Sequence, residues 1–409
     1  MKRVAHAGVC RFSRSNKNNI VFDYGKGCFV YDTEGKSYID FVLGYGPVIL
    51  GHSNQEFNEI LTNFIKKGIH LPGYSHWHEL YAQRLLGVHS KKFLVSFFKT
   101  GSESVSAALR LSSLITGKKG IIRCGYVGWH DALVGNSVRW HESLESPLRQ
   151  EIRYMSGIRG IGPEEPVLNW INLDIEELYK LVSCNCDRIG AFVFDAYQIY
   201  FSSIDIFKKA IDLCRKNNIL ILCDETKTGG RISKLGIAID EMLNVDMIIL
   251  GKSLANGAPL SLLIGKDEIL KYSEEARITG TFSKELLSIY CALATLDIME
   301  KRSGYEIIKN YGQKVVDIIN EVSKEIGIID VVKARPVFGG SLFNIEYTKP
   351  ILEDSKMRGL FMQCLADNNL LILQGHPSFI CIDHENIDFG YLYELIYNGL
   401  KVWKTHIRI

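Results

Sequence analysis

The pattern of apolar residues in the middle of the chain constrains its fold more than any other feature. Between residues 93 and 265, short apolar runs alternate with longer amphipathic or polar stretches. The runs expected to be strands are Phe93–Phe98, Gly120–Cys124, Ala191–Phe194, Ile219–Cys223, Met247–Leu250 and Leu260–Ile264. Such runs are typical of strands buried on both faces, as in parallel sheets covered by helices. The sequence therefore predicts an α/β fold with a mostly parallel central sheet.

Helical and hairpin patterns surround these runs. Apolar residues recur at helical spacing in Ser102–Thr116 and Ile204–Asn217, which predicts crossover helices. Near the N-terminus, Gly27–Asp40 alternates around a turn-forming segment and predicts a β-hairpin. A long helical pattern covers Ile289–Glu300, and a mixed region follows it.

The length of the chain allows one large domain with smaller additions. We expect three segments along its 409 residues. They are an N-terminal segment with the hairpin at residues 1–50, a large ligand-binding domain at residues 51–290 and a small C-terminal α/β domain at residues 291–409.

The composition argues against several classes of protein. The chain has 48 Lys and Arg against 46 Asp and Glu, so its charge gives no reason to expect nucleic acid or an anionic membrane as a partner. Its ten cysteines are scattered and form no C-x-x-C pair, which indicates reduced thiols in a cytoplasmic protein. No apolar run approaches the length that crosses a bilayer, and no apolar stretch follows the basic residues at the N-terminus. We therefore expect a cytoplasmic protein that acts on small molecules.

Three histidines near Glu79 have the appearance of part of a zinc site. They are His70, His76 and His78, but no matching set of Cys or His follows them in the chain. We interpret them as residues that satisfy local hydrogen bonds, and Glu79 as part of the start of a helix. We expect no metal.

Polar residues that could bind a ligand follow several of the predicted strands. In open α/β sheets, ligands bind beyond the carboxyl ends of the strands. Thr100–Glu103 follows the strand that ends at Phe98 and begins a helix, so its backbone N–H groups could bind a phosphate. A plain helix cap at Thr100 or Ser102 explains the same residues equally well.

Two ionisable residues also follow apolar runs. Asp224 ends one run, and a buried carboxylate needs a partner, so we expect either a cationic ligand group or an arginine or helix N-terminus from elsewhere in the fold. Lys252 follows another run and precedes a turn of small residues. A desolvated lysine loses its proton readily and attacks carbonyl groups, although an exposed loop lysine is the more ordinary interpretation. Tyr126 follows a third run, where its ring could stack on a planar ligand or pack within the loop.

Taken in order, these segments resemble the class III aminotransferases, which are pyridoxal-phosphate enzymes of fold type I, and especially the branch around glutamate-1-semialdehyde aminomutase. The resemblance covers nearly the whole chain. The segments that carry it are VYDTEGKSYIDFVLGYG, FFKTGSESVSAALRLSSLITGK, GYVGWHDALVG, LCDETKTGGR, LGKSLANGAPLS and TGTFSKELLSIYCALATL. It implies a large domain with a mostly parallel sheet and a smaller α/β domain built from the N- and C-terminal segments.

The resemblance assigns roles to residues at matching positions. Lys252 is expected to hold pyridoxal 5'-phosphate (PLP) as a Schiff base, and Asp224 to support the nitrogen of its pyridine ring. The remaining contacts that it implies are Gly101 and Ser102 for the phosphate, and Tyr126 and Thr226 for the two faces of the ring.

The resemblance also implies partners. Gly280 and Thr281 match a segment that reaches the cofactor phosphate of a neighbouring subunit, so a homodimer with shared active sites is expected. Arg14 matches the arginine that ends a glycine-rich segment, which makes it a candidate for binding a substrate carboxylate.

The expected function is the transfer of an amino group between an amino donor and a small carbonyl substrate. The segments GWHD and TFSKELLS resemble those of family members found with surface-polysaccharide or specialised-metabolite pathways. Val127 stands where the family usually has histidine, and Asp195-Ala196 where it has a Glu-Pro pair, which bears on the substrate and not on the cofactor. Alternative functions are an intramolecular aminomutase and a non-catalytic binding subunit that keeps the fold.

Overall fold

The computed structural model describes residues 12–14, 19–133, 136–154, 156–158 and 165–407, and divides the chain into two compact units. Unit 1 comprises Met1–Leu43, Gly51–Asn54 and Ile307–Ile409. Unit 2 comprises Gly44–Leu50 and Gln55–Glu306. The N-terminal and C-terminal segments thus belong to one unit, and the expected sheet region belongs to the other.

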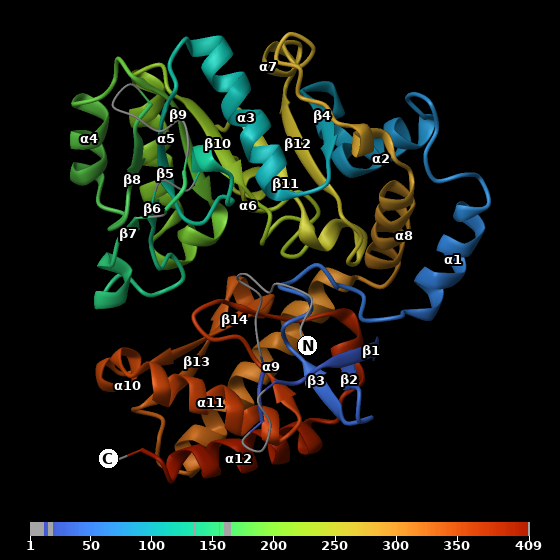
Figure 1. Cartoon of the computed structure of the whole chain (residues 1–409), viewed down its shortest axis with the longest axis vertical. Coiled ribbons are helices and arrows are strands. Elements are labelled where there is room, and N and C mark those ends of the chain that lie inside the picture. The colour runs from blue at the N-terminus through green and yellow to red at the C-terminus, as the bar shows by residue number, and fades with distance from the viewer. Residues whose placement is uncertain (1–11, 15–18, 134–135, 155, 159–164, 408–409) are drawn as a thin grey trace. The chain divides into compact units, whose positions relative to one another are not determined.

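Unit 2 is built on a seven-stranded sheet (Figure 1). Its strands, in spatial order, are β4 (Phe93–Phe98), β12 (Ser261–Lys266), β11 (Met247–Leu250), β10 (Leu220–Asp224), β9 (Ile189–Asp195), β5 (Gly120–Cys124) and β8 (Val167–Asn169). From β11 to β8 all neighbours are parallel, whereas β12 is antiparallel to both β11 and β4. The prediction of a mostly parallel sheet is confirmed.

The reversed direction of β12 follows from the short connection that precedes it. Only residues 251–260 join β11 to β12, and their one regular element is the 3₁₀ turn η5 (Lys252–Ala255). A parallel neighbour needs a crossover of a dozen residues or more, so this connection favours an antiparallel return. The strand β8 was missed in the sequence because three residues are too few to form a recognisable pattern.

Helices cover both faces of this sheet (Figure 1). On one face, Val193 of β9 lies in an apolar cluster with residues of α3 (Gly101–Thr116). On the other face, the next residue, Phe194, has its ring 5.1 Å from that of Phe207 in α5 (Ile204–Lys216), beside α4 (Ile175–Ser183). Successive side chains of a strand point to opposite faces, so a strand covered on both sides must be apolar throughout.

Further helices of unit 2 pack around α8 (Leu287–Lys301), whose residues are buried on nearly all sides. Its neighbours are α1 (Gln55–Ile65), α2 (His76–Leu86) and η5. The predicted boundary between residues 290 and 291 differs from this division, because α8 packs within unit 2 along its whole length. The short elements of this unit are α6 (Ile237–Asp240), α7 (Asp267–Leu270), β6 (Asn136–Ser137) and β7 (Arg153–Tyr154).

Unit 1 contains two small sheets. The first has the order β1-β2-β3-β15, with bounds Phe22–Lys26, Phe29–Asp32, Ser37–Asp40 and Leu370–Leu371. The second has the order β13-β14-β16, with bounds Val332–Val337, Leu342–Tyr347 and Ser378–Phe379. The antiparallel pairing of β2 with β3 confirms the predicted hairpin, and the parallel pairing of β3 with β15 joins the two ends of the chain in one sheet.

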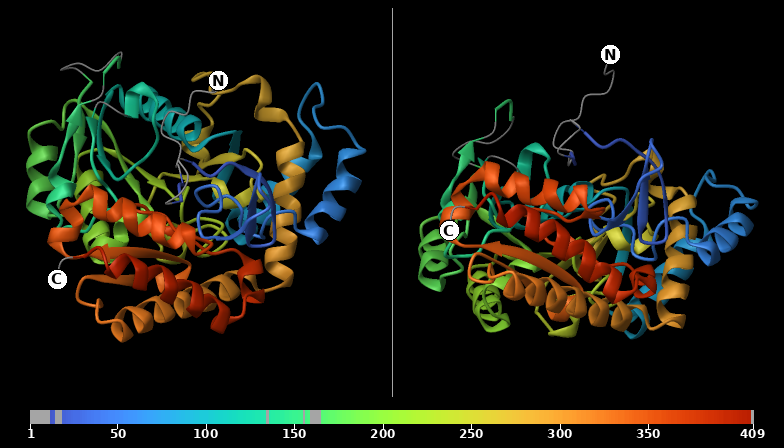
Figure 2. Two further views of the ribbon diagram at one scale, coloured as in Figure 1. Left: turned by 60° about the horizontal axis from the view of Figure 1, so that its bottom comes forward. Right: turned by 90° about the horizontal axis from the view of Figure 1, so that it is seen from below.

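The helices of unit 1 are α9 (Gly304–Glu325), α10 (Lys349–Glu353), α11 (Ser355–Asp367) and α12 (Phe389–Lys404). In Figure 2, α11 and α12 lie side by side in orange-red and dark red. The rings of Trp403 and Phe361 pack edge to face at a centroid distance of 5.0 Å, so aromatic packing joins these two helices.

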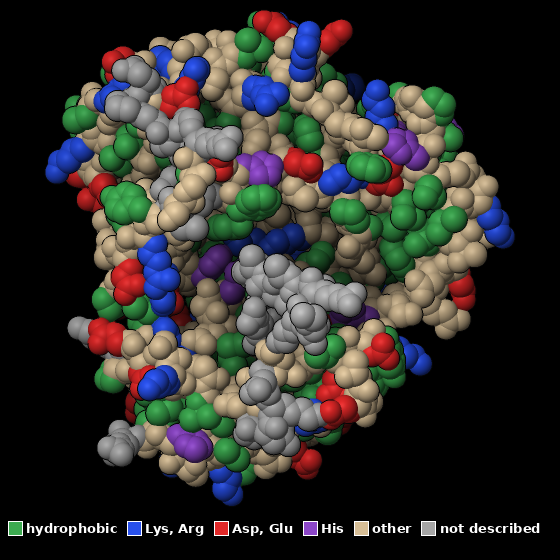
Figure 3. All heavy atoms as spheres, viewed as in Figure 1, with side chains coloured by type: hydrophobic (Ala, Val, Ile, Leu, Met, Phe, Trp, Pro, Cys, Tyr) green, Lys and Arg blue, Asp and Glu red, His purple; other side chains and the backbone are tan. Residues whose placement is uncertain are grey.

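The face of the molecule in Figure 3 has no large region of a single charge. Lys and Arg (blue) and Asp and Glu (red) are interspersed over it, in line with the nearly balanced composition. Among the described residues, no helix combines the length and the apolar character needed to span a membrane.

Trp170 offers a test of the packing on the α5 face of the sheet. It is completely buried, contacts the rings of Phe192 and Phe207, and donates a hydrogen bond from Nε1 to the carbonyl of Asp174 at 2.8 Å. We expect Trp170→Ala to lower the free energy of unfolding by about 3–5 kcal/mol, measured by urea denaturation. Tyr179→Ala, on the exposed side of α4, is the control and should change it by less than about 0.5 kcal/mol. Equal effects of the two changes would contradict this packing.

Candidate active site

The carboxyl ends of six strands of unit 2 meet at one edge of the sheet. These strands are β4, β5, β8, β9, β10 and β11, and they run in the same direction because β12, the remaining strand, is antiparallel to both of its neighbours. A cavity of about 310 Å³ lies there, at the lower end of the range of roughly 300–1,000 Å³ for small-molecule sites. The residues of the sequence prediction that line it are Gly101, Ser102, Tyr126, Asp224, Thr226 and Lys252.

The first turn of α3 supplies one wall of the cavity. Thr100 caps the helix and forms a capping box with Glu103: the Glu103 N–H donates to Thr100 Oγ1, and the Thr100 N–H donates to Glu103 Oε2 at 2.8 Å. The N–H groups of the following residues, Gly101 and Ser102, belong to the turn whose donors have no partner within the helix. With the helix dipole, they form a site suited to an anion such as a phosphate.

Glycines keep the backbone close together around this turn. A Cβ atom at Gly128 would lie 2.8 Å from Ser102 Oγ and 2.6 Å from a methyl carbon of Leu133, and its φ of +127° is itself unfavourable for other residues. A Cβ at Gly101 would lie 3.0 Å from Thr226 Oγ1. The space at the helix end is therefore shaped by backbone and small side chains, which is what a phosphate-binding loop requires.

Asp224 is the last residue of β10 and is almost completely buried. Its Oδ1 accepts hydrogen bonds from the backbone N–H of Thr226, at 2.9 Å, and from the Thr226 hydroxyl. Burial, and then the charge of Asp195 on the neighbouring strand, raise the pKa of Asp224 from 3.8 to about 6. Asp224 therefore ionises within the physiological range and would be stabilised by a cationic group in the cavity.

Lys252 follows β11 and begins the turn η5. Its φ is +47°, a left-handed conformation that residues other than glycine seldom adopt, and such backbone strain is concentrated at functional sites. Burial, and then the charge of Lys227, lower the pKa of Lys252 from 10.5 to about 7. Near neutral pH a large fraction of this side chain is the neutral amine, which is the form that attacks a carbonyl.

Tyr126 and Thr226 complete the cavity. The ring of Tyr126 is about half exposed and lies on the cavity wall after β5, so it can present a flat face to a ligand. Thr226 packs between two glycines, because its methyl carbon would lie 3.2 Å from a Cβ at Gly251 and its hydroxyl faces Gly101. The cavity thus combines an anion site, a carboxylate, an amine and an aromatic ring.

Three predicted residues are not among those that line the cavity. Gly280 and Thr281 are exposed, and they stand at the start of the 3₁₀ turn η6 (Thr281–Lys284). Arg14 belongs to unit 1, where its guanidinium lies 3.4 Å from Asp32 and 3.2 Å from Glu34. The roles predicted for these residues stay predictions.

The histidines near Glu79 do not converge on a common point. His78 is buried in α2 with its Nδ1 3.3 Å from the carbonyl oxygen of Ser75, and the ring of His70 contacts that of Phe282. Within the ranges that the structure describes, no group of three or more His, Cys, Asp or Glu residues could hold a metal ion.

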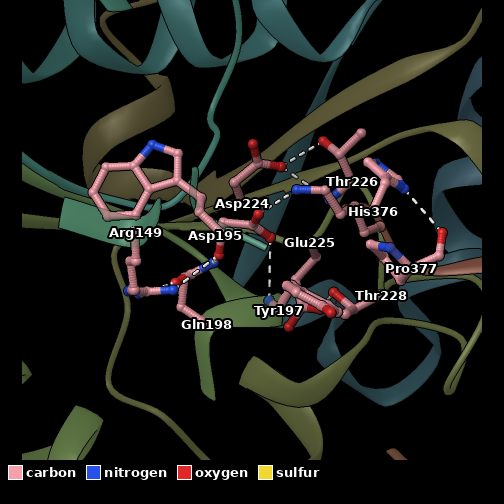
Figure 4. A network of polar contacts seen from close by, with 12 residues as sticks. Arg149, Asp195, Tyr197, Gln198, Asp224, Glu225, Thr226, Thr228, His376 and Pro377 are labelled. Atoms are coloured by element: carbon pink, nitrogen blue, oxygen red, sulfur yellow. Dashed lines mark hydrogen bonds and ion pairs between the residues drawn. The ribbon is translucent and has the colours of Figure 1, made fainter. Parts of the chain in front are cut away.

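Sequence reasoning missed Lys227, which also lines the cavity. It stands three residues after Asp224 and forms a buried ion pair with Asp195, the last residue of β9 (Figure 4 labels Asp195 and Asp224). Lysines are mostly exposed, so the sequence around Lys227 did not indicate that its side chain is buried. Its position three residues after Asp224 was the one available indication that it belongs to the site.

Comparisons with known proteins match the chain over nearly its whole length. The family model described as "Aminotransferase class-III" matches residues 12–388. A curated 3-aminobutyryl-CoA aminotransferase from Cloacimonas acidaminovorans is 25% identical over 93% of this chain and 89% of its own length. A glutamate-1-semialdehyde 2,1-aminomutase from Syntrophobacter fumaroxidans is 24% identical over 93% of this chain and 90% of its own. A solved transaminase with PLP bound superposes with a TM-score of 0.80 and 17% identity, covering 97% of this chain and 94% of that one.

The fold is that of the PLP-dependent transferases of fold type I. The chain belongs to the class-III aminotransferases, a family of enzymes that use PLP as cofactor and act on amino donors and carbonyl compounds. The cavity fits this cofactor: the glycine-lined helix end suits its phosphate, the carboxylate of Asp224 its ring nitrogen, and the amine of Lys252 its aldehyde.

The pKa of Lys252 can be measured without any cofactor. We expect Lys252, in the cofactor-free protein, to react with trace acetic anhydride at a rate that rises with pH and is half-maximal near pH 7, because only the neutral amine is acetylated. Lys119 is the internal control: it is exposed, and its hydrogen bond to Glu165 and the charge of that residue raise its pKa above 10.5. The measurement is peptide mass spectrometry after labelling at a series of pH values. A midpoint for Lys252 close to that of Lys119 would contradict the geometry described.

Proposed function

We propose that this enzyme transfers an amino group from an amino donor to a small carbonyl acceptor, with the chemistry at the strand-end cavity of unit 2. The observation that carries the proposal is that one cavity is lined by Lys252, Asp224 and the first turn of α3. When bound, PLP supplies an electron sink that stabilises negative charge on the carbon next to the transferred amino group. The residues around it provide binding, orientation and proton transfer.

The first turn of α3 would hold the phosphate. The N–H groups of Gly101 and Ser102 would donate to its oxygens, and the positive end of the helix dipole would favour its charge. Tyr126 and Thr226, which both line the cavity, would hold the two faces of the cofactor ring. Since Thr226 is fixed by its hydrogen bonds to Asp224, the face it presents is rigid.

Asp224 would keep a proton on the ring nitrogen. A carboxylate beside that nitrogen would keep it positively charged, and the positive ring would withdraw electrons from the reacting carbon. A cation there favours the ionised form of Asp224 and offsets the burial that raises the pKa of this group. The acid and the ring nitrogen therefore stabilise each other's charged form.

Lys252 has two tasks. Its amine would hold the cofactor covalently at the aldehyde, and in its free form the same amine would serve as the base for the reacting carbon. As a base with a pKa near neutrality, it can then accept the proton of that carbon and return it one atom further along. Proton transfer of this kind contributes typically about 10²–10⁴-fold to a rate.

Two further parts of the proposal concern predicted residues that are not among those lining the cavity. Gly280 and Thr281 are exposed in this chain, which supports a role toward the cofactor phosphate of a second copy and hence a homodimer with shared sites. Arg14 is proposed as a ligand for a substrate carboxylate.

Every cysteine among the described residues is a free thiol, which supports a reducing, cytoplasmic location.

An aminomutase is the second candidate, because a curated relative that matches almost the whole chain is named as one. The two functions differ in whether the carbon skeleton leaves between the halves of the reaction. Transfer releases a carbonyl product after the donor reacts, whereas mutation retains the nitrogen within one molecule. The expected pathway class, polysaccharide or specialised-metabolite synthesis, stays a prediction.

A screen of amino donors tests the proposal. We expect at least one amine to convert the PLP-loaded protein to the amine form of the cofactor, with stoichiometric release of a carbonyl product, followed by absorbance and mass spectrometry. Lys252→Ala should slow this conversion by about 10²–10⁴-fold or more, because base and covalent anchor are both lost. Lys119→Ala, at an exposed lysine of the same unit, should leave it unchanged. Retention of ¹⁵N in the starting skeleton would favour the aminomutase, and full activity of Lys252→Ala would refute the role of that residue.

The proposed phosphate site can be tested by substituting two glycines whose φ angles are positive. Gly128→Ala should weaken PLP binding about tenfold or more, or about 1.4 kcal/mol, because the new methyl group displaces Ser102. Gly117→Ala is the control: its φ of +69° is also positive, at the other end of α3, but nothing lies within 4 Å of the added carbon. The measurement is equilibrium binding of PLP to each protein. If both changes weaken binding equally, strain alone is responsible and the proposed location of the phosphate is wrong.

A further inference from the structure

Two buried acids stand side by side at the cavity. Asp195 ends β9 and Asp224 ends β10, and the two are paired in the parallel register of these strands, so their side chains lie on the same face of the sheet. Figure 4 shows them as neighbours, and their residues are only 1% and 5% exposed. Like charges this close in a buried place disfavour each other's ionised form. The fold therefore creates an electrostatic conflict beside the group that is proposed to face the cofactor nitrogen.

Lys227 lies where it can resolve this conflict. Its Nζ forms an ion pair with Asp195 Oδ2, and the two side chains are 4% and 1% exposed. The same ammonium lies 5.6 Å from the ring centroid of Tyr126 and 5.9 Å from that of Tyr197. Because Lys227 also lines the cavity with Lys252 and Asp224, its charge acts on both of those groups.

The other ionisable groups at this place do not change this conclusion. The charged groups that act on Lys252 are Lys227, Asp195, Asp224 and Arg231. Burial raises the pKa of the thiols of Cys124 and Cys223, so both stay neutral beside Asp195. Burial and the charge of Asp224 raise the pKa of Tyr126, which also stays neutral.

Stability alone does not explain this ion pair. Removing two charges from water costs several kcal/mol, and a buried ion pair is often no more stabilising than well-packed apolar residues of the same volume. Its position beside the reacting groups gives it an electrostatic use that an apolar pair would lack.

We propose that Lys227 is a positioning residue for the transfer reaction: held by Asp195, its ammonium cancels the charge of that acid, so that Asp224 can ionise and Lys252 can remain a neutral amine in the same cavity. This inference rests on the proposed function for its purpose, but its electrostatics can be tested without cofactor. The charge of Lys227 favours ionised Asp224 and neutral Lys252, whereas the charge of Asp195 opposes both. Removal of one partner must therefore act in the opposite direction to removal of the other.

The test is the acetic anhydride labelling of Lys252 in cofactor-free protein, applied to Lys227→Met, Asp195→Asn and the double variant. We expect the midpoint for Lys252 to rise by about one pH unit in Lys227→Met and to fall by about one pH unit in Asp195→Asn. In the double variant the midpoint should return to within about half a pH unit of the parent, since the two changes share one interaction.

Control variants separate electrostatics from loosened packing. Lys227→Arg keeps the charge and should leave the midpoint near that of the parent. Lys234→Met removes a lysine that pairs with Glu300 at a partly exposed place in the same unit, and should also cause no shift. A merely structural pair would loosen the cavity when either partner is lost, which would move the midpoint of Lys252 upward in both single variants. Shifts in the same direction, or no shift in either, would overturn the proposal, and circular dichroism identifies any variant that has not folded.

The closing measurement distinguishes this inference from the function on which it rests. The pH titration of the visible absorption of PLP-loaded protein should show the same opposite shifts in the two single variants. Opposite shifts in labelling, together with PLP bound at a residue other than Lys252, would uphold the charge pair and refute the proposed role of Lys252. PLP bound at Lys252, together with parallel shifts, would uphold the function and refute the pair.

Discussion

The common direction of six strands is the constraint on which the rest of the site depends. In a parallel sheet the carboxyl ends lie at one edge, so residues as distant in the sequence as Gly101 and Lys252 are delivered to one cavity. The short antiparallel return through β12 contributes as well. It keeps the chain after Lys252 at this edge, where Pro259 and Leu260 close the wall, and sends no crossover helix away from it.

Burial alone could not prepare this cavity for PLP chemistry. Desolvation favours the neutral form of every ionisable group, which suits Lys252 as a nucleophile and base but works against Asp224, whose proposed task requires a charge. The cavity must therefore favour the ionised form of Asp224 while it keeps the neutral form of Lys252 favoured. A nearby cation satisfies both requirements, since it stabilises a carboxylate and destabilises an ammonium, and Lys227 is such a cation. One side chain can thus serve two residues of opposite chemistry.

The sequence was sufficient to predict those parts of the fold that repeat a pattern. The apolar runs that became β4, β5 and β11 were found with their bounds, because these strands are mostly apolar and the polar segments on either side mark their ends. The three residues of β8 carried no such pattern, and the predicted boundary between residues 290 and 291 fell inside α8 because the packing partners of this helix are distant in sequence. For the site, strand ends led to Asp224 and Lys252, and the family resemblance added Thr226. Lys227 was missed because its burial depends on Asp195, which belongs to a neighbouring strand.

The left-handed backbone at Lys252 has a consequence for how such a chain can lose activity over evolutionary time. A φ of +47° is tolerated by glycine and, less well, by asparagine, and Asn256 at the end of the same turn has a φ of +43°. Branching at the β-carbon makes this conformation still harder to adopt. A lineage freed from selection for the amine would therefore drift more readily to Gly or Asn at this position than to Val or Ile. Its inactive descendants would have a more relaxed turn than the working enzyme.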